Sequence, residues 1–510
     1  MRKGFKRTVA LALSAGMLLG MSLSSYATTI DNSYTYNYDY WGDVQDSPDM
    51  YSVCKVFTST ELGLDQRLNS PQGSYVQGNL LYILDTGNNR IVVFDRTSRE
   101  SLELVRVIDS FKGKDGSTDT FSSPTDMAIS ESGNIFIADK GNARILKLDK
   151  DLNYIREFTK PVDNSLDKDI VFQPSKIAID TAERVYCVAT GINKGLIKYE
   201  SDGTFSGFVG ATRVVFDFKM YLMKKIATQE QLNKMESFVP TEYDNLYMDN
   251  EGFVYACTGN VEAETLKAGD EDSIRRINPL GDDILIRNGV YWDGDFPVYG
   301  DLYMGNGGGY TGPSRFADVT VFDNDAYVCL DRNRGRLFTY DDQGRMICVF
   351  GGAGNMDGYF RNPLSLEHMG YDLIVVDQLD CTITIFTLTD YGQLVFDAMD
   401  QFDNGEYAKS GKTWREVMKY NGNYDLAYIG LGRAYLRQKD YDEAMDYFKL
   451  KYDDENYSKA YKKHRKEFVE DHIVLIVIVL LALFLVPMSI GKVKSIKREF
   501  LISDAFKYNN

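Results

Sequence analysis

The chain has 510 residues, of which 44% are hydrophobic and 13% aromatic, and its formal net charge is −17. This length predicts about three domains, and the aromatic content excludes a disordered polymer and favours β-structure. The negative charge argues against nucleic acid as a partner, because phosphates bind basic surfaces. Three histidines and six cysteines, with no Cys-x-x-Cys pair, leave little for a zinc site.

The N-terminal segment predicts export. Four basic residues lie within residues 1–7, an apolar stretch runs from Thr8 to Leu23, and Ser25-Tyr26-Ala27 forms an A-x-A-like cleavage site. We expect a signal peptide over residues 1–27. An uncleaved anchor is the alternative, and either one would export the domains C-terminal to it. The Tyr-rich segment 28–50 is expected to be a linker or a strand that contacts the cell wall.

A repeated pattern fills residues 51–399. Each copy has a proline, a short apolar strand, a turn, a strand rich in Tyr, Ile and Val that ends at an Asp, and a further strand after a polar turn. The opening prolines are Pro71, Pro124, Pro174, Pro240, Pro313 and Pro363. Short strands at even spacing predict an all-β array with one four-stranded sheet per copy.

This pattern resembles the NHL-repeat β-propeller family, whose signature is an Asp, a polar turn and Asn-Arg-Ile at the next strand. The Asp-x4-Arg pairs that carry the resemblance are Asp85–Arg90, Asp139–Arg144 and Asp331–Arg336. The resemblance implies an all-β six-bladed propeller. We expect the strand Tyr51–Phe57 to complete the last blade and close the ring.

Some copies depart from the family pattern. Ala189 and Thr258 stand near the Asp position of copies three and four, and Thr382 replaces the Arg of copy six. A pair that recurs in several copies is most simply structural, since a catalytic group is needed only once. We therefore interpret the Asp/Arg pairs as groups that satisfy turn hydrogen bonds.

Two insertions interrupt the repeats. Residues 217–237 have helical spacing and are expected to cover the propeller or to dock on the C-terminal helices. The loop 291–310 combines aromatic rings with carboxylates, which suits a sugar, because rings stack on its apolar face and carboxylates accept from its hydroxyls. Packing of this loop on the propeller edge is the alternative. The candidate ligand-binding residues are Tyr291, Trp292, Asp293, Asp295, Tyr299 and Tyr310.

No catalytic set can be assigned from the sequence. A zinc lyase of the NHL kind would need several histidines, and the propeller region has only His368. Gluconolactonase-like propellers use Asp, Glu and Asn to hold calcium; this acidic propeller has many such residues, but no motif singles out a set. We expect no cofactor, with calcium as the one ion to test. The cysteines lie mostly in apolar strands and are compatible with up to three disulfides or with buried thiols: Cys54, Cys187, Cys257, Cys329, Cys348 and Cys381.

From about Tyr391 the hydrophobic period becomes helical. The spacing of small and aromatic residues resembles the tetratricopeptide (TPR) pattern, and three positions recur at an offset of 34 residues. The residues expected to pack the helices together are Trp414, Tyr428, Gly432, Tyr435, Ala444 and Phe448. We expect a small all-α module over 400–470, with helices at 391–403, 407–419, 425–438 and 441–452 and a capping helix from about Tyr457.

The segment Ile473–Ile490 has no charged residue over 18 positions. Such a helix rises about 27 Å, enough to cross a bilayer. Basic residues flank both ends, so the signal peptide decides the orientation: N-terminal domains outside, and a cytoplasmic tail over 491–510.

This order of segments resembles membrane-anchored NHL–TPR surface proteins of Gram-positive bacteria, which are often associated with carbohydrate uptake. The leading hypothesis is a non-catalytic cell-surface protein whose propeller binds a glycan or a protein and whose TPR helices contact a membrane partner. The alternatives are a calcium-dependent lactone or ester hydrolase and a scaffold without a small ligand.

Overall fold

The computed structural model describes residues 35–163, 166, 169–210, 243–289, 297–302 and 312–507. The chain divides after Gln393 into two compact units, which we describe separately. The expected signal peptide, the insertion 217–237 and most of the loop 291–310 lie outside the described residues.

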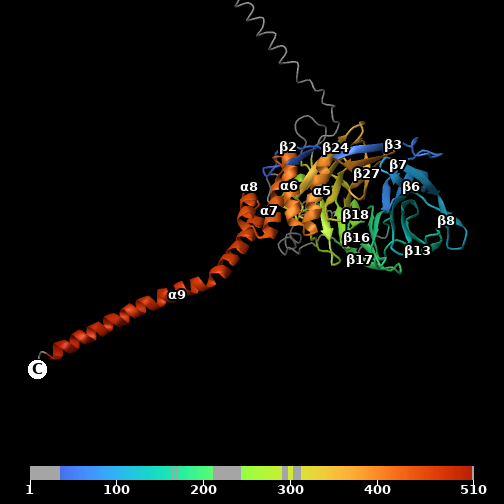
Figure 1. Cartoon of the computed structure of the whole chain (residues 1–510). Coiled ribbons are helices and arrows are strands. Elements are labelled where there is room, and N and C mark those ends of the chain that lie inside the picture. The colour runs from blue at the N-terminus through green and yellow to red at the C-terminus, as the bar shows by residue number, and fades with distance from the viewer. Residues whose placement is uncertain are drawn as a thin grey trace, which may run out of the picture. The chain divides into compact units, whose positions relative to one another are not determined.

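Antiparallel sheets of the N-terminal unit form a β-propeller, as predicted (Figure 1). Five sheets have the four strands of a complete blade. In order these are β4 (Gly73–Gln77), β5 (Leu80–Asp85), β6 (Arg90–Ser98) and β7 (Ser101–Ile108); β10 (Pro124–Ile129), β11 (Ile135–Asp139), β12 (Arg144–Leu148) and β13 (Tyr154–Phe158); β14 (Pro174–Ile179), β15 (Val185–Ala189), β16 (Leu196–Tyr199) and β17 (Phe205–Val209); β21 (Phe316–Val321), β22 (Tyr327–Asp331), β23 (Arg336–Tyr340) and β24 (Met346–Ala353); and β26 (Pro363–Met369), β27 (Asp372–Asp377), β28 (Thr382–Leu388) and β3 (Tyr51–Phe57).

A further sheet shows three strands, β18 (Asn245–Met248), β19 (Val254–Cys257) and β20 (Ile274–Ile277). Because a fourth strand is not among the described residues of this sheet, the six-bladed count stays a prediction. The short elements in the segments that connect these strands are η1 (Thr86–Asn88), β8 (Ser110–Lys112), β9 (Thr118–Thr120), η2 (Lys140–Asn142), α4 (Ala263–Ala268) and β25 (Tyr359–Phe360).

The sheets form a closed ring. Their first strands β4, β10, β14, β18, β21 and β26 contact one another in this order, and β26 contacts β4. The blue strand β3 pairs with β28 in the last sheet, with Val56 opposite Thr384 (Figure 1). The predicted closing strand is therefore confirmed. Apolar side chains fill the space between neighbouring sheets; for example, Leu84 and Val93 belong to one buried cluster with Ile137 and Leu146.

The repeated Asp residues hold the turns of the propeller. The Asp85 carboxylate accepts from the Asn69 backbone N–H at 2.7 Å, from the Asn88 amide at 2.8 Å and from Arg90 Nε at 2.7 Å. Asp139 accepts from Arg144 Nε at 2.9 Å. Both carboxylates are fully buried, so each needs these donors to offset the loss of water. These contacts agree with the structural interpretation of the two pairs.

At the third predicted pair a different arginine holds the carboxylate. Asp331 accepts from Arg334 Nη1 at 3.1 Å and from the backbone N–H groups of Asn333 and Arg334. The guanidinium of Arg336 lies over the ring of Tyr36, 4.8 Å from its centroid. Arg334, three residues after Asp331, thus contacts the carboxylate for which the repeat pattern predicted Arg336, five residues after it.

The Tyr-rich segment is not a free linker over its described part. β1 (Tyr36–Tyr38) pairs with β24 and with β2 (Val44–Asp46), so both strands extend a propeller sheet. Tyr36 is only 1% exposed, and its hydroxyl donates to the Asp301 carboxylate at 2.9 Å. The Tyr38 hydroxyl donates to the same carboxylate. Tyrosine combines an apolar ring with a polar tip, which suits a strand that covers a buried acid.

All six cysteines are free thiols in the structure. Cys187, Cys257, Cys329 and Cys348 are buried in strands. Burial raises the pKa of each of these four thiols, which keeps them protonated and unreactive at neutral pH.

The C-terminal unit is helical and agrees with the predicted helix boundaries. Its helices are α5 (Asp390–Asp403, which begins before the unit boundary), α6 (Tyr407–Tyr420), α7 (Asp425–Gln438), α8 (Tyr441–Leu450) and α9 (Asp454–Lys507). Consecutive helices from α6 to α9 contact one another.

Small residues allow these helices to approach closely. A Cβ atom at Gly432 would lie 2.7 Å from the ring of Phe448, and one at Gly430 would lie 2.4 Å from the ring of Trp414. Ala444 and Phe448 are fully buried, while Tyr435 stacks on Tyr447 with ring centroids 5.6 Å apart. Gly432 and Phe448 are both among the predicted packing residues, and Gly430 is an additional contact that the sequence pattern did not single out.

The long red helix α9 contains the predicted span (Figure 1). Among the described residues it is the one helix long and apolar enough to cross a membrane, and its apolar window is not buried against protein. Pro487 lies inside it.

Candidate functional site

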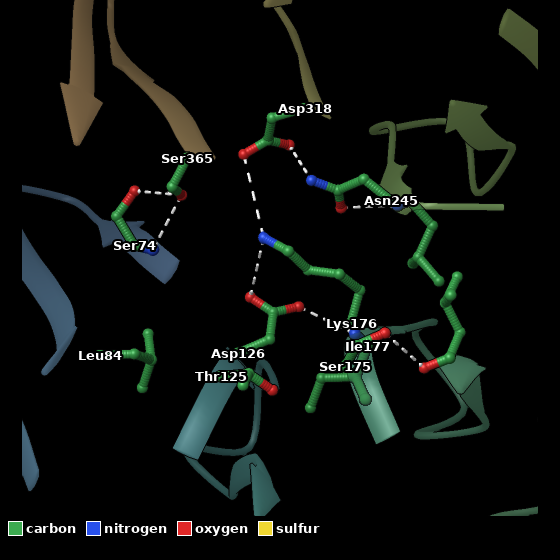
Figure 2. A network of polar contacts seen from close by, with 12 residues as sticks. Ser74, Leu84, Thr125, Asp126, Ser175, Lys176, Ile177, Asn245, Asp318 and Ser365 are labelled. Carbon is green, nitrogen blue, oxygen red and sulfur yellow. Dashed lines mark hydrogen bonds and ion pairs between the residues drawn. The ribbon is translucent and has the colours of Figure 1, made fainter. Parts of the chain in front are cut away.

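The first strands of the sheets present a layer of mostly polar residues toward the axis of the propeller. Five of its members lie opposite the residue next to the end of the second strand, for example Asp126 opposite Ala138 and Asp318 opposite Leu330, and Asn245 lies opposite Cys257, the last residue of β19. We call this set the axial layer; its residues are Gly73, Asp126, Lys176, Asn245, Asp318 and Ser365. Figure 2 shows the Lys176 side chain directed between Asp126 and Asp318, which come from different sheets.

The ammonium of Lys176 bridges the two carboxylates at long distance. Its Nζ lies 3.9 Å from Asp126 Oδ1 and 4.0 Å from Asp318 Oδ2. The Lys176 side chain is 12% exposed, and the two acids are 10% and 8% exposed. At these distances the attraction is an ion pair without a direct hydrogen bond.

Hydrogen bonds extend the layer around the ring (Figure 2). Asp126 accepts from the Ile177 backbone N–H at 2.8 Å, which joins β10 to β14. Asp318 accepts from the Asn245 amide at 2.6 Å and from the Leu366 N–H at 2.7 Å, which joins β18, β21 and β26. The axial layer therefore links the inner strands of most sheets.

A second link in the layer joins the last sheet to the first. The Ser365 hydroxyl accepts from the Ser74 N–H at 2.9 Å and lies 2.8 Å from the Ser74 hydroxyl (Figure 2). Gly73 is the layer member on β4, where a Cβ atom would lie 2.4 Å from the Thr125 carbonyl oxygen. The close approach of β4 to β10 thus requires glycine at this position.

Burial and charge set the protonation of this layer. Burial raises the pKa of Asp126 to about 6 and also raises the pKa of Asp318. Burial opposes the charge of Lys176, but Asp126 and Asp318 raise the pKa of its ammonium above the ordinary value. Burial, with the nearby Asp318 and Asp126, holds the pKa of Glu367 well above its usual range. These shifts favour the charged form of Lys176 and the protonated form of Glu367.

Lys176 lines two cavities of opposite character. One, of about 450 Å³, also contains Lys140, Arg315 and Arg332, with Asp244 as its acid. We call it the cationic cavity. The other, of about 260 Å³, contains Asp126, Asp318 and Glu367. We call it the acidic cavity.

The axial carboxylates do not fit a calcium ion. Calcium takes six to eight oxygen ligands, whereas Asp126 and Asp318 face a tethered ammonium that would repel a second cation. Within the described ranges no group of three or more His, Cys, Asp or Glu could hold a metal. His368 Nδ1 lies 2.7 Å from the Thr320 hydroxyl, and burial lowers the pKa of this histidine. Whether calcium binds elsewhere on the chain stays a prediction.

Of the six ligand-binding residues predicted from the sequence, the structure describes only Tyr299. Tyr291, Trp292, Asp293, Asp295 and Tyr310 lie outside the described residues. Tyr299 is 3% exposed, its hydroxyl donates to the Ile286 carbonyl at 2.9 Å, and its ring meets that of Tyr340 at 4.7 Å. Tyr299 is therefore a core residue and not part of a ligand surface.

The axial layer was not predicted from the sequence, although a signal was present. Asp126, Lys176 and Ser365 each stand two residues after an opening proline, at the start of an otherwise apolar strand. A charged side chain in such a strand needs a buried partner. The repeat pattern did not show that these partners are one another.

No family model and no curated protein matches the chain. Solved structures that match include virginiamycin B lyase from Staphylococcus aureus, with 11% identity over 66% of this chain and 100% of that one and a TM-score of 0.39. BamB from Moraxella catarrhalis has 11% identity over 62% and 84%, with a TM-score of 0.32. A putative gluconolactonase has 10% identity over 67% and 94%, with a TM-score of 0.36. These are propeller proteins of different function, and the fold assignment for this chain comes from its strand pairing.

Replacement of the axial lysine tests its role in stability. Lys176→Met leaves Asp126 and Asp318 without their cation, and we expect a loss of about 3 kcal/mol in unfolding free energy at pH 8. The loss should shrink toward pH 5, where the carboxylates take up protons. Guanidinium unfolding of the full chain in detergent measures both values. Lys150→Met, at an exposed turn, should change the free energy by less than about 0.5 kcal/mol, and an equal effect of both variants would contradict the assignment.

The raised pKa of Glu367 predicts a pH dependence of stability. In the unfolded chain Glu367 ionises above about pH 4.3, whereas in the folded chain it keeps its proton, so folding takes up a proton. Stability therefore falls as pH rises from about 5, by up to about 1.4 kcal/mol per pH unit from this group. Glu367→Gln should flatten this dependence and unfold at higher temperature than the parent at pH 8. Parallel curves for the two proteins between pH 5 and 8 would refute this.

Proposed function

We propose that the chain is a membrane-anchored, non-catalytic binding protein whose six-bladed, NHL-type propeller holds a ligand outside the cell. One observation supports a non-catalytic role for the propeller: the charged groups of the axial layer bind one another. Asp126 and Asp318 face Lys176 and accept backbone hydrogen bonds from neighbouring strands. Groups engaged in this way hold the sheets together, which supports a structural role.

The calcium-dependent lactone or ester hydrolase is the weaker candidate. It would be favoured by free carboxylates on the axis, and the axis does carry Asp126, Asp318 and Glu367. However, Lys176 supplies the positive charge there, and the raised pKa of Glu367 favours its neutral form. These two features argue against a metal-activated water at this place.

The C-terminal helices support a role in contacting a partner. Their lengths, their consecutive contacts and the glycine-to-ring packing agree with a TPR-like module. Two repeats are fewer than the three usually needed for stability. A partner in or near the membrane would supply the missing contact, and we infer a link to carbohydrate uptake from the family resemblance alone.

The anchor is inferred from α9. Its apolar part would cross the membrane once, with the propeller outside the cell and residues 491–510 in the cytoplasm. This orientation depends on export by the N-terminal segment 1–27.

Ligand binding is tested by thermal unfolding of the full chain in detergent with a panel of oligosaccharides. A ligand at 100 times its dissociation constant stabilises by about 2.7 kcal/mol, which raises Tm by several degrees. If the loop 291–310 binds the sugar, Trp292→Ala removes this shift and leaves the ligand-free Tm unchanged. Lactone turnover that requires calcium and stops with EDTA would refute the non-catalytic proposal.

Partner contact is tested by crosslinking in membranes with two glycine variants. Gly430→Ala places a methyl group against the Trp414 ring, which should destabilise α6 and α7 by about 1–3 kcal/mol. Gly422→Ala is the control, because the nearest atom to its Cβ would be the Met418 carbonyl oxygen at 3.9 Å. We expect Gly430→Ala to abolish a crosslinked band that Gly422→Ala retains. A band that both variants retain would argue against contact through these helices.

A further inference from the structure

The cationic cavity has a charge that runs against the rest of the chain. Four of its five charged lining residues are basic, Lys140, Lys176, Arg315 and Arg332, and one is acidic, Asp244. Over the whole chain, by contrast, 74 acidic residues outnumber 57 basic ones. A cavity lined at random would therefore be acidic.

The basic residues come from opposite sides of the cavity. Lys140 directly follows β11 and Arg332 directly follows β22, so both stand at the same position of their sheets. In the ring of first strands, β10 and β21 are three steps apart in either direction, so these two sheets face each other. Arg315 lies beside Arg332, whose backbone N–H donates to the Arg315 carbonyl at 3.0 Å.

Three of these basic residues, Lys140, Arg315 and Arg332, form no ion pair in the described part of the chain. Lys176 reaches Asp126 and Asp318 only at 3.9 and 4.0 Å and forms no direct hydrogen bond to either. Like charges that converge without counterions repel one another, and an anion in the cavity would relieve this repulsion.

The remaining lining is rich in neutral hydrogen-bonding groups. Hydroxyls and amides contribute to the wall of the cavity: Gln72, Thr125, Ser175, Thr190, Asn260 and Asn333. Such groups suit a polyhydroxylated molecule, while the basic residues suit a carboxylate or a phosphate. A volume of about 450 Å³ has room for a small saccharide.

We propose that the cationic cavity binds an anionic saccharide, a sugar that carries a carboxylate or a phosphate. Lys140, Arg315 and Arg332 hold the anion, and the neutral side chains hold the hydroxyls. This inference rests on the proposed binding function. It names the chemical class of the ligand and the cavity that receives it.

The test is titration calorimetry of the full chain in detergent with three probes: trigalacturonate, glucose 6-phosphate and the neutral maltotriose. We expect binding of at least one anionic probe, weakened by added salt, and none of maltotriose. The carboxylate and phosphate arms distinguish the two sources of negative charge. Lys140→Gln and Arg332→Gln should each weaken binding about tenfold, since each removes a charge-assisted hydrogen bond.

Two further variants separate charge from folding. Lys150→Gln removes the same charge at an exposed turn outside the cavity and should leave the affinity unchanged. Thr190→Lys should strengthen binding of the anionic probe. Thr190 directly follows β15, as Lys140 follows β11, and it lines the same cavity. A gain of affinity cannot result from misfolding.

The outcomes also separate this inference from the proposed function. Binding of maltotriose with equal affinity, or equal behaviour of Lys140→Gln and Lys150→Gln, overturns the anionic site while the binding function stands. Absence of binding by all three probes overturns the inference as well. The oligosaccharide panel and the membrane crosslinking then decide whether the binding function itself survives.

Discussion

Closure of the ring is the constraint on which the propeller depends. A sheet of this type has an inner strand next to the axis and an outer strand with an open edge, and a ring of such sheets must join its ends. Here β3, from the N-terminal part, adds to β28 in the last sheet. The hydrogen bonds of that strand pair hold two segments more than 300 residues apart. The positions of all other sheets depend on this closure, because each inner strand contacts the next one in the ring.

The axial layer adds a polar constraint to this closure. Inner strands converge at the axis, where there is little room and little water, so a charged side chain needs a partner from another sheet. Lys176 meets this need by facing Asp126 and Asp318 across the axis. Buried ion pairs contribute little net stability, but they strongly penalise arrangements in which one partner is missing. The layer therefore favours one order of the sheets over others with similar apolar packing.

This arrangement also separates the acidic cavity from the cationic cavity. Lys176 stands between the acidic cavity, where Asp126, Asp318 and Glu367 gather, and the cationic cavity with its arginines. The carboxylates neutralise Lys176 from one side, so the other side is free to present positive charge to a ligand. The same residues that stabilise the ring thus determine which of the two cavities can attract an anion.

Much of the fold could be predicted because local patterns repeat. The Asp at the end of the second strand returns with its turn donors, so Asp85–Arg90 and Asp139–Arg144 were recognisable from spacing alone. Spacing alone did not identify the arginine that holds Asp331. Arg336 lies against Tyr36 of β1, and Arg334 takes its place beside Asp331. Tyr299 was predicted to bind a ligand but is buried, because an aromatic residue in a loop can equally enter the core that the loop covers.

The sequence by itself determined the strands, their turns, the boundaries of the C-terminal helices and the apolar segment of α9. Each of these depends on residues within a few positions of one another, and periodicity reveals such relations. Only the tertiary structure decided that Gly73, Asp126, Lys176, Asn245, Asp318 and Ser365 form one layer, and that Lys140 and Arg332 face each other. These residues come from different sheets and meet only after the ring has closed, so no local pattern in the chain records their proximity.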